Sequence, residues 1–153
     1  MNHKAPSIRR FKVASGTLAL LLTPALSGCG GSSKPWEVVV PASGQVTFEG
    51  KPVAGAQITL YPTSAEVPDT VRPSATTSED GSFVLGTYGA NDGAPAGDYK
   101  AGIVWFKVVD TGGGPVRGNN VLPQKYSNPE ASGIVVTVNA PETRVAAISL
   151  TKK

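Results

Sequence analysis

The sequence predicts an all-β protein, a Greek-key β-sandwich of about seven strands that follows a signal peptide and a short flexible tether. Short runs rich in valine, isoleucine and threonine alternate between apolar and polar residues, as half-buried strands do. The 18 glycines and 13 prolines of the chain separate these runs at intervals typical of turns. No repeat or heptad pattern is present, and the part that follows the leader is long enough for one domain but not for two.

The predicted strands differ in how regularly they alternate. Residues 43–48 and 57–61 alternate most clearly, and they form either a β-hairpin or a short crossover between neighbouring strands. Asp80-Gly81 lies between two β-prone runs, which is a strong hairpin signal. In chain order, the expected strands are 43–48, 57–61, 74–77, 82–85, 99–109, 134–138 and 145–150.

The run 99–109 is the most apolar one after the leader, with apolar side chains on both of its faces. We therefore expect it to be covered on both sides, at the centre of a sheet. Residues 110–133 have no clear period and exceed the roughly 12 to 15 residues at which an unstructured loop becomes unusual. They are expected to form a loop that is either functional or mobile.

The first 28 residues have the order of a secretory signal: a basic start, an apolar run over 13–22 and small residues. Leu26-Ser27-Gly28-Cys29 then resembles the lipobox of bacterial lipoproteins. The resemblance implies that Cys29 carries a lipid on its sulfur and becomes the first residue. The alternative is an ordinary signal peptide followed by an incidental cysteine.

This leader sets the expected domain organisation and location. Residues 1–28 form the signal peptide, 29–35 a lipidated tether and 36–153 the β-sandwich. The protein is expected to be exported and anchored to a membrane through Cys29. By resemblance to lipoprotein sorting, Gly30 favours the outer membrane where the cell has one.

Composition after the leader excludes several classes of function. Four of the 14 lysines and arginines precede Cys29, and none of the 11 acids does. Residues 29–153 therefore have a net charge of −1. This charge gives no basic face for nucleic acid. His3 is the only histidine, which excludes Ser-His-Asp and Cys-His catalysis and histidine or cysteine metal sites after the leader. We expect no enzyme activity, no cofactor and no metal; Asp80, Asp92 and Asp98 lie in turns but lack calcium-loop spacing.

A second resemblance concerns the domain itself. Residues 42–48, 51–58, 77–83 and 95–99 are similar to the carboxypeptidase regulatory-like domains of transthyretin-like fold. Residues 122–129 resemble the second half of small bacterial lipoproteins of this type. The resemblance implies the fold; the related intradiol dioxygenases and hydroxyisourate hydrolases need histidine, so neither activity is expected.

Two functions follow as hypotheses. The first is a lipid-anchored, non-enzymatic module of the cell envelope with an interaction or structural role, whose contact surfaces are the loops 86–97 and 110–133. The alternative is a carbohydrate-binding accessory lipoprotein. Tyr88 and Tyr126, which lie in predicted loops, are then the possible ligand contacts, whereas Trp105 is expected in the core. Either hypothesis leaves the protein or glycan partner unknown.

Overall fold

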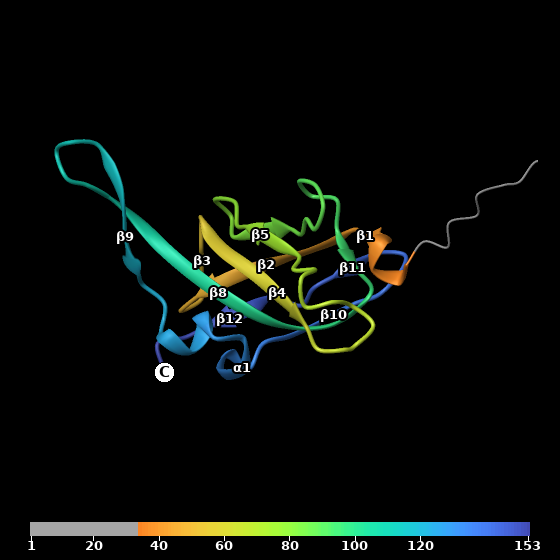
Figure 1. The fold of residues 1–153 in the computed structure, drawn as a ribbon. Helices are drawn as coiled ribbons and strands as arrows, with labels where there is room; N and C mark the ends of the chain where they lie inside the picture. The colour runs from red at the N-terminus through yellow and green to blue at the C-terminus, as the bar shows by residue number, and fades with distance from the viewer. Residues whose placement is uncertain (1–33) are drawn as a thin grey trace, which may run out of the picture. The chain divides into compact units, whose positions relative to one another are not determined.

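The computed structural model describes residues 34–153, and within them the chain forms the all-β sandwich that its sequence predicts. Residues 34–153 contain twelve strands rather than about seven. Of the five strands that were not predicted, one lies over residues 115–120, and the other four have only two residues each, too few to show a period in the sequence. Two of these, β1 (Val39–Val40) and β7 (Ala94–Pro95), pair with each other near the start of the domain. Figure 1 shows the two larger sheets, with β2 and β12 behind β4 and β8.

The first sheet is built on β2 (Ala42–Phe48), which confirms the strand expected over 43–48. Two strands from the end of the chain run parallel to β2 on one side, and two others pair with it antiparallel. These four strands are β11 (Thr143–Arg144), β12 (Ile148–Leu150), β3 (Lys51–Pro52) and β6 (Ser82–Val84). Between β11 and β12, residues 145–147 lie outside both strands and leave a gap beside β2.

The second sheet is built on the long strand β8 (Gly97–Asp110). Its other strands are β10 (Val135–Val138), β4 (Ala56–Pro62), β5 (Ser74–Thr76) and β9 (Pro115–Asn120). The order is β10-β8-β4-β5, and β9 also pairs with β8. Apolar side chains from both sheets fill the space between them, among them Val46, Ile58, Leu60, Leu85 and Leu150, each at most 1% exposed.

β8 is buried over only half of its length. Tyr99, Ala101 and Ile103 have no exposed surface. Two short helices, η2 (Gln124–Ser127) and α1 (Pro129–Ser132), contact β8, and both approach it at Gly102. The expected central strand is therefore confirmed up to Ile103. It is wrong for the end of the strand, where Val108 is 72% exposed.

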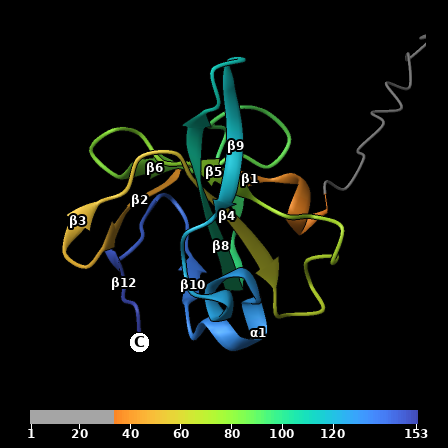
Figure 2. The same cartoon turned by 90° about the vertical axis from the view of Figure 1, so that its left-hand side faces the viewer.

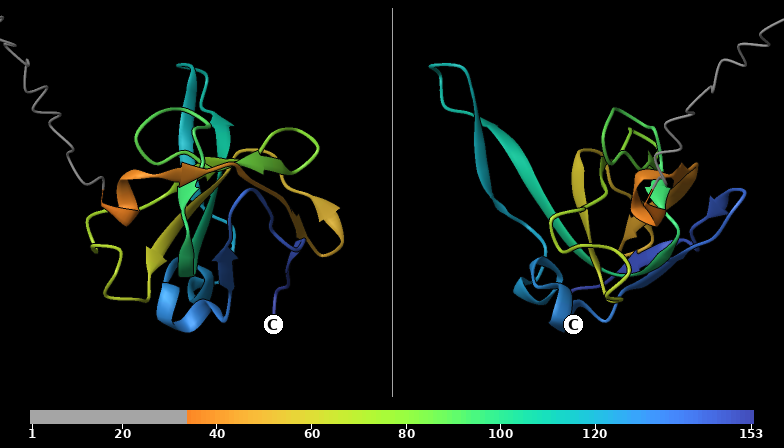
Figure 3. Two further views of the ribbon diagram at one scale, coloured as in Figure 1. Left: turned by 90° about the vertical axis from the view of Figure 1, so that its right-hand side faces the viewer. Right: turned by 45° about the vertical axis from the view of Figure 1, so that its right-hand side comes forward.

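The prediction of a loop over residues 110–133 was also wrong. β8 continues through Asp110, turns at 111–114 and returns as β9, so the two strands form a twisted ribbon that extends away from the sandwich (Figures 1 and 3). The helices η2 and α1 account for much of the remainder. An irregular ladder, with a register shift between Phe106 and Val108, explains why no alternation was visible.

The Asp80-Gly81 turn joins two sheets instead of forming a hairpin. The turn itself is present, since Gly81 N–H donates to Ser78 C=O and Ser78 N–H to Ser82 C=O. β5 before it pairs with β4 in the second sheet, whereas β6 after it pairs with β2 in the first. The hairpin prediction therefore failed because tertiary pairing separates the two flanking strands. Figure 2 shows β5 and β6 next to each other, below the tip of the β8–β9 ribbon.

Candidate functional site

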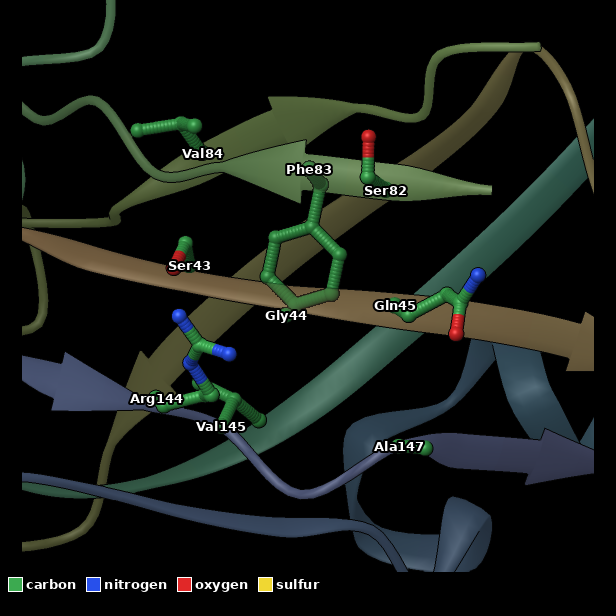
Figure 4. A pocket seen from close by; sticks show the side chains of 9 residues that line it. All are labelled: Ser43, Gly44, Gln45, Ser82, Phe83, Val84, Arg144, Val145 and Ala147. Atoms are coloured by element: carbon green, nitrogen blue, oxygen red, sulfur yellow. The ribbon is translucent and has the colours of Figure 1, made fainter. Parts of the chain in front are cut away.

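An open groove of about 440 Å³ lies on the outer side of the first sheet. It lies where residues 145–147 depart from β2, so β2 and β6 form one wall and the β11–β12 connection forms the other. Nine residues line it: Ser43, Gly44, Gln45, Ser82, Phe83, Val84, Arg144, Val145 and Ala147. We call it the Arg144 groove (Figure 4). A smaller hollow of about 230 Å³ continues from it and shares Ser43, Val84 and Arg144.

Strand alternation decides which side chains form the rim of the groove. Ser43 pairs with Val84 and with Arg144, and Gln45 pairs with Ser82. Because residues opposite each other in a ladder share a face, these polar side chains stand on the same side of the sheet. The rim thus combines two hydroxyl groups, one amide and one guanidinium beside the half-exposed Val84.

The floor depends on Gly44. The ring of Phe83, which is 4% exposed, packs against the Gly44 backbone. A Cβ atom at this position would lie 2.6 Å from Cζ of Phe83 and 3.0 Å from Cβ of Val145, so no side chain fits without displacing them. Figure 4 shows the ring between Arg144 and Gln45. The floor is therefore closed and apolar beneath a polar rim.

The Asp80-Gly81 turn holds one end of the rim. The Gln45 amide donates to the Asp80 carbonyl (2.8 Å), and the Ser82 hydroxyl and N–H donate to the Asp80 carboxylate (2.6 and 2.9 Å). These bonds from Ser82 hold the pKa of Asp80 below its usual value. Gly81 has φ +77°, and a Cβ there would lie 2.5 Å from the Val46 carbonyl, so the turn requires glycine.

Arg144 is the one cation on the rim. It is exposed, and among residues 34–153 its guanidinium has neither an ion pair nor a hydrogen bond. The salt bridge in this part of the chain joins Lys100 and Glu130. Guanidinium groups bind carboxylates through two parallel hydrogen bonds. The groove therefore offers an anion-binding group next to hydroxyl and amide groups.

The two tyrosines singled out in the sequence lie outside this groove. Tyr88 is 57% exposed, and its hydroxyl donates to the Trp36 carbonyl. Burial raises the pKa of Tyr88, and the nearby Glu37 and Asp92 charges raise it further. Tyr88 is accessible to a ligand, and its role as a ligand contact stays a prediction.

Tyr126 is placed less favourably for binding. Only 5% of it is exposed, because it belongs to η2 rather than to a loop, and its hydroxyl accepts a hydrogen bond from the Thr151 N–H (3.0 Å). Burial raises the pKa of Tyr126, but its bond to Thr151 and the Lys125 charge lower it more, so the net shift is downward. Tyr126 packs in the core in this position, and its role as a ligand contact stays a prediction.

The three turn aspartates do not converge. Asp80 binds Ser82, Asp98 accepts from the Thr137 hydroxyl (2.6 Å), and Asp92 accepts the N–H groups of the loop after β6. Burial raises the pKa of Asp92, but these N–H groups lower it more, and it lies below its usual value. Within residues 34–153, no group of three potential ligands could hold a metal ion.

Two further expectations concern the membrane and the core. Cys29 lies outside the described residues, so its lipidation and the division into leader, tether and domain stay predictions. None of the helices in residues 34–153 is long and apolar enough to span a bilayer.

Trp105 is only partly buried; its indole N–H donates to the Ala54 carbonyl (2.9 Å), and its ring meets Phe48 edge-on.

Sequence reasoning missed the Arg144 groove. The alternation of 43–48 indicated that Gln45 faces outward, but nothing in the sequence indicated that Arg144 lies beside it. These two residues are 99 positions apart in the chain, and parallel pairing of β11 with β2 brings them together. A parallel pairing across such a distance has no local signal, which is why this site could not be found from the sequence.

Comparisons with known proteins give distant matches only. No protein-family model matches the chain, and no curated protein matches it. Solved structures similar to it include a proposed carbohydrate-binding protein from Pseudomonas aeruginosa, with 14% identity and a TM-score of 0.39 over 79% of this chain and 92% of that one. A 9R-lipoxygenase from Cyanothece PCC8801 matches with 18% identity and a TM-score of 0.38, over 78% of this chain and 17% of the lipoxygenase.

A third similar structure is the dioxygenase domain of a dioxygenase carbohydrate-binding protein fusion from Streptomyces sp. SirexAA-E. It has 20% identity and a TM-score of 0.35, over 80% of this chain and 84% of that one. The lipoxygenase and the dioxygenase domain contradict the expectation that this chain is not an enzyme. That expectation is withdrawn, because a missing histidine excludes only histidine-based chemistry. At these TM-scores the matches assign neither a family nor an activity to the chain.

Proposed function

We propose that this domain binds a carbohydrate bearing carboxylate groups, and that the Arg144 groove is the binding site. The observation that carries the proposal is Arg144 itself, an exposed guanidinium without a partner among residues 34–153, placed on the rim of this groove. Here the guanidinium is combined with groups that bind hydroxyls.

The chemistry of the rim favours a sugar over other anions. Sugar hydroxyls both donate and accept hydrogen bonds, and so do the Ser43 hydroxyl and the Gln45 amide, whereas the Ser82 hydroxyl donates to Asp80 and can accept from a ligand. The Gln45 amide nitrogen already binds Asp80, which leaves its oxygen to accept from a ligand. The exposed Val84 gives an apolar surface for the C–H face of a pyranose.

The shape of the groove favours an extended ligand. It is open along its length and continues into the neighbouring hollow near Glu142. Small-molecule sites enclose most of their ligand, whereas this surface leaves one side of a ligand in solvent. An oligosaccharide lying across β2 would place one uronic acid carboxylate at Arg144 and neighbouring hydroxyls along the rim.

A binding panel tests this proposal directly. The full chain is titrated calorimetrically with oligosaccharides of equal length that contain either uronic acids or only neutral sugars, at about 50 and about 300 mM salt. We expect binding to the acidic series that weakens at high salt, since screening reduces exposed charge interactions. Absence of binding to either series would contradict the proposal.

Export and lipid anchoring are proposed separately. The lipobox-like Leu26 to Cys29 and the basic, apolar order before it support attachment to a membrane through Cys29. Mass spectrometry of the native protein should then show a chain that begins at a lipid-modified Cys29, and Cys29→Ala should leave the precursor unprocessed. An unmodified thiol would contradict this proposal without affecting the one on the groove.

A second candidate function is docking of a protein partner on the β8–β9 ribbon. The observation that favours it is an exposed aliphatic surface: Val108, Val109 and Val116 are 72%, 48% and 46% exposed. A two-stranded ribbon is marginally stable alone, so a partner that covers these valines would stabilise it. Cross-linking from the ribbon in cells, with capture lost in Val108→Asp, is the measurement that would support this function over glycan binding.

A further inference from the structure

The β10 strand has a free edge. It pairs only with β8 in the described part of the chain, and the Ala101 N–H donates to the Ile134 carbonyl (3.0 Å). Hydrogen bonds alternate along an antiparallel ladder, so the backbone groups of Val135 and Thr137 point away from β8. Within residues 34–153 no other backbone group binds them. The edge thus presents donors and acceptors in the spacing of a strand.

This edge lacks the features that usually protect edge strands. Proteins block such edges with charged residues, prolines or bulges. Residues 134–138 read Ile-Val-Val-Thr-Val, with no charge and no proline, and their ladder with β8 has no bulge. Other edge strands carry such a feature or have no more than three residues: β3 is Lys51–Pro52, β9 contains Pro115 and Arg117 beside a bulge, β11 contains Arg144, and β5, β6 and β12 have three residues each.

Space for another strand lies beside this edge. A hollow of about 360 Å³ runs between residues 133–137 and 144–149, the edges of the two sheets. Val135 on its rim is 68% exposed. Although β10 and the β11–β12 segment are consecutive in the chain, they belong to different sheets and do not pair with each other.

We propose that β10 pairs antiparallel with β10 of a second copy of this chain, joining two domains through their second sheets. The occupant is a second copy because this edge is self-complementary: an uncharged strand meets its own copy without like-charge repulsion, and a two-fold axis at Val136 places Val135 of one copy opposite Thr137 of the other. Both residues then use their outward backbone groups. The hollow beside β10 shares Arg144, Val145 and Ala147 with the Arg144 groove, but the proposed pairing uses only the backbone of β10.

The test compares two exposed valines. Val135→Lys puts a charge on the proposed edge, whereas Val38→Lys puts the same charge just before β1, at a site that is also exposed (68% and 54%). The mass of each full-length variant is followed by analytical ultracentrifugation from about 1 to about 500 μM, the range in which small interfaces dissociate. All variants share residues 1–33, so association through that part cancels in the comparison.

The expected result is a concentration-dependent dimer in the wild type and in Val38→Lys, with a dissociation constant at least about tenfold higher in Val135→Lys. Hydrogen exchange gives an independent readout: the Val135 and Thr137 amides should be protected at high concentration and exchange rapidly at low concentration. A wild type that stays monomeric overturns the proposal, and so does a dimer that Val135→Lys leaves unchanged or whose Val135 and Thr137 amides exchange freely. Equal melting temperatures of the two variants establish that neither has unfolded.

Discussion

Arg144 and Arg117 are both exposed arginines on edge strands, yet their surroundings differ completely. Arg117, on β9, lies 3.5 Å from the centre of the Phe106 ring and donates to the Gln57 side chain (3.2 Å). Arg144, on β11, has no such contact within residues 34–153 and stands over a groove. The comparison shows that charge and exposure alone do not identify a binding residue. The guanidinium of Arg117 is occupied in holding the ribbon to the sheet, whereas that of Arg144 is free for a ligand.

The largest effect is expected on the floor of the groove. Gly44→Ala should destabilise the domain by about 1–3 kcal/mol, because the new Cβ overlaps the buried Phe83 ring and Val145. Gly113→Ala, at the tip of the ribbon, is the matched control: nothing lies within 4 Å of its Cβ position, and its effect should stay within about 0.5 kcal/mol. Urea unfolding measures both. Equal stabilities would show that the groove is less tightly packed than its geometry indicates.

Arg144→Lys separates the charge of the groove from its geometry. Lysine keeps the positive charge but cannot form the two parallel bonds of a guanidinium. Losing one charge-assisted hydrogen bond, at about 1.5 kcal/mol, should weaken binding of a uronic acid oligosaccharide about tenfold. Calorimetric titration gives the two affinities. If lysine binds as tightly as arginine, the site recognises charge alone.

Arg117→Gln should act on the ribbon and leave the groove intact. Loss of a cation–π contact at an exposed site costs about 0.5–1 kcal/mol, and the ribbon should open more often. Amide exchange at Val116 reports this opening, while affinity for the oligosaccharide should match the wild type. A change in affinity with unchanged exchange would reverse the roles given to the two arginines.

The smallest effect is a pH dependence at the rim. The pKa of Asp80 is lowered by Ser82 in the folded protein, so folding favours its ionised form. This contribution is present above the unfolded pKa of about 3.9 and is lost as pH falls through the lower folded value. The Ser82 amide signal in NMR should shift over that acidic range, and Asp80→Asn should abolish the shift. A Ser82 signal that titrates near pH 4 or above would mean that the turn bonds are absent in solution.

The sequence contained enough to predict the fold class but not the site. Alternation predicted β2, β4 and β10 because each has one buried face, visible as Val46, Ile58 and Val136. Alternation did not predict how much of β8 is buried, because the two halves of this strand are equally apolar. Burial depends on η2 and α1, which cover only one half. Local turn chemistry was equally limited: Asp80-Gly81 does turn the chain, but long-range pairing decides which sheet each flanking strand joins.

The residues proposed as ligand contacts show the same difference between what local sequence predicts and what tertiary structure decides. Tyr88 was correctly placed in an exposed loop, whereas Tyr126 lies in a buried helical turn that no period indicated. The groove residues come from β2, β6 and β11, which only tertiary structure brings together.

Calorimetry with Arg144→Gln and Arg117→Gln tests the central claim most directly. Both variants lose one positive charge from an exposed strand, so any general effect of net charge on an acidic oligosaccharide is the same in each. Our account predicts that Arg144→Gln weakens binding by about 10- to 100-fold, as expected for losing a charged hydrogen-bonding group, while Arg117→Gln binds like the wild type. Equal losses in both variants, or no loss in Arg144→Gln, would contradict it.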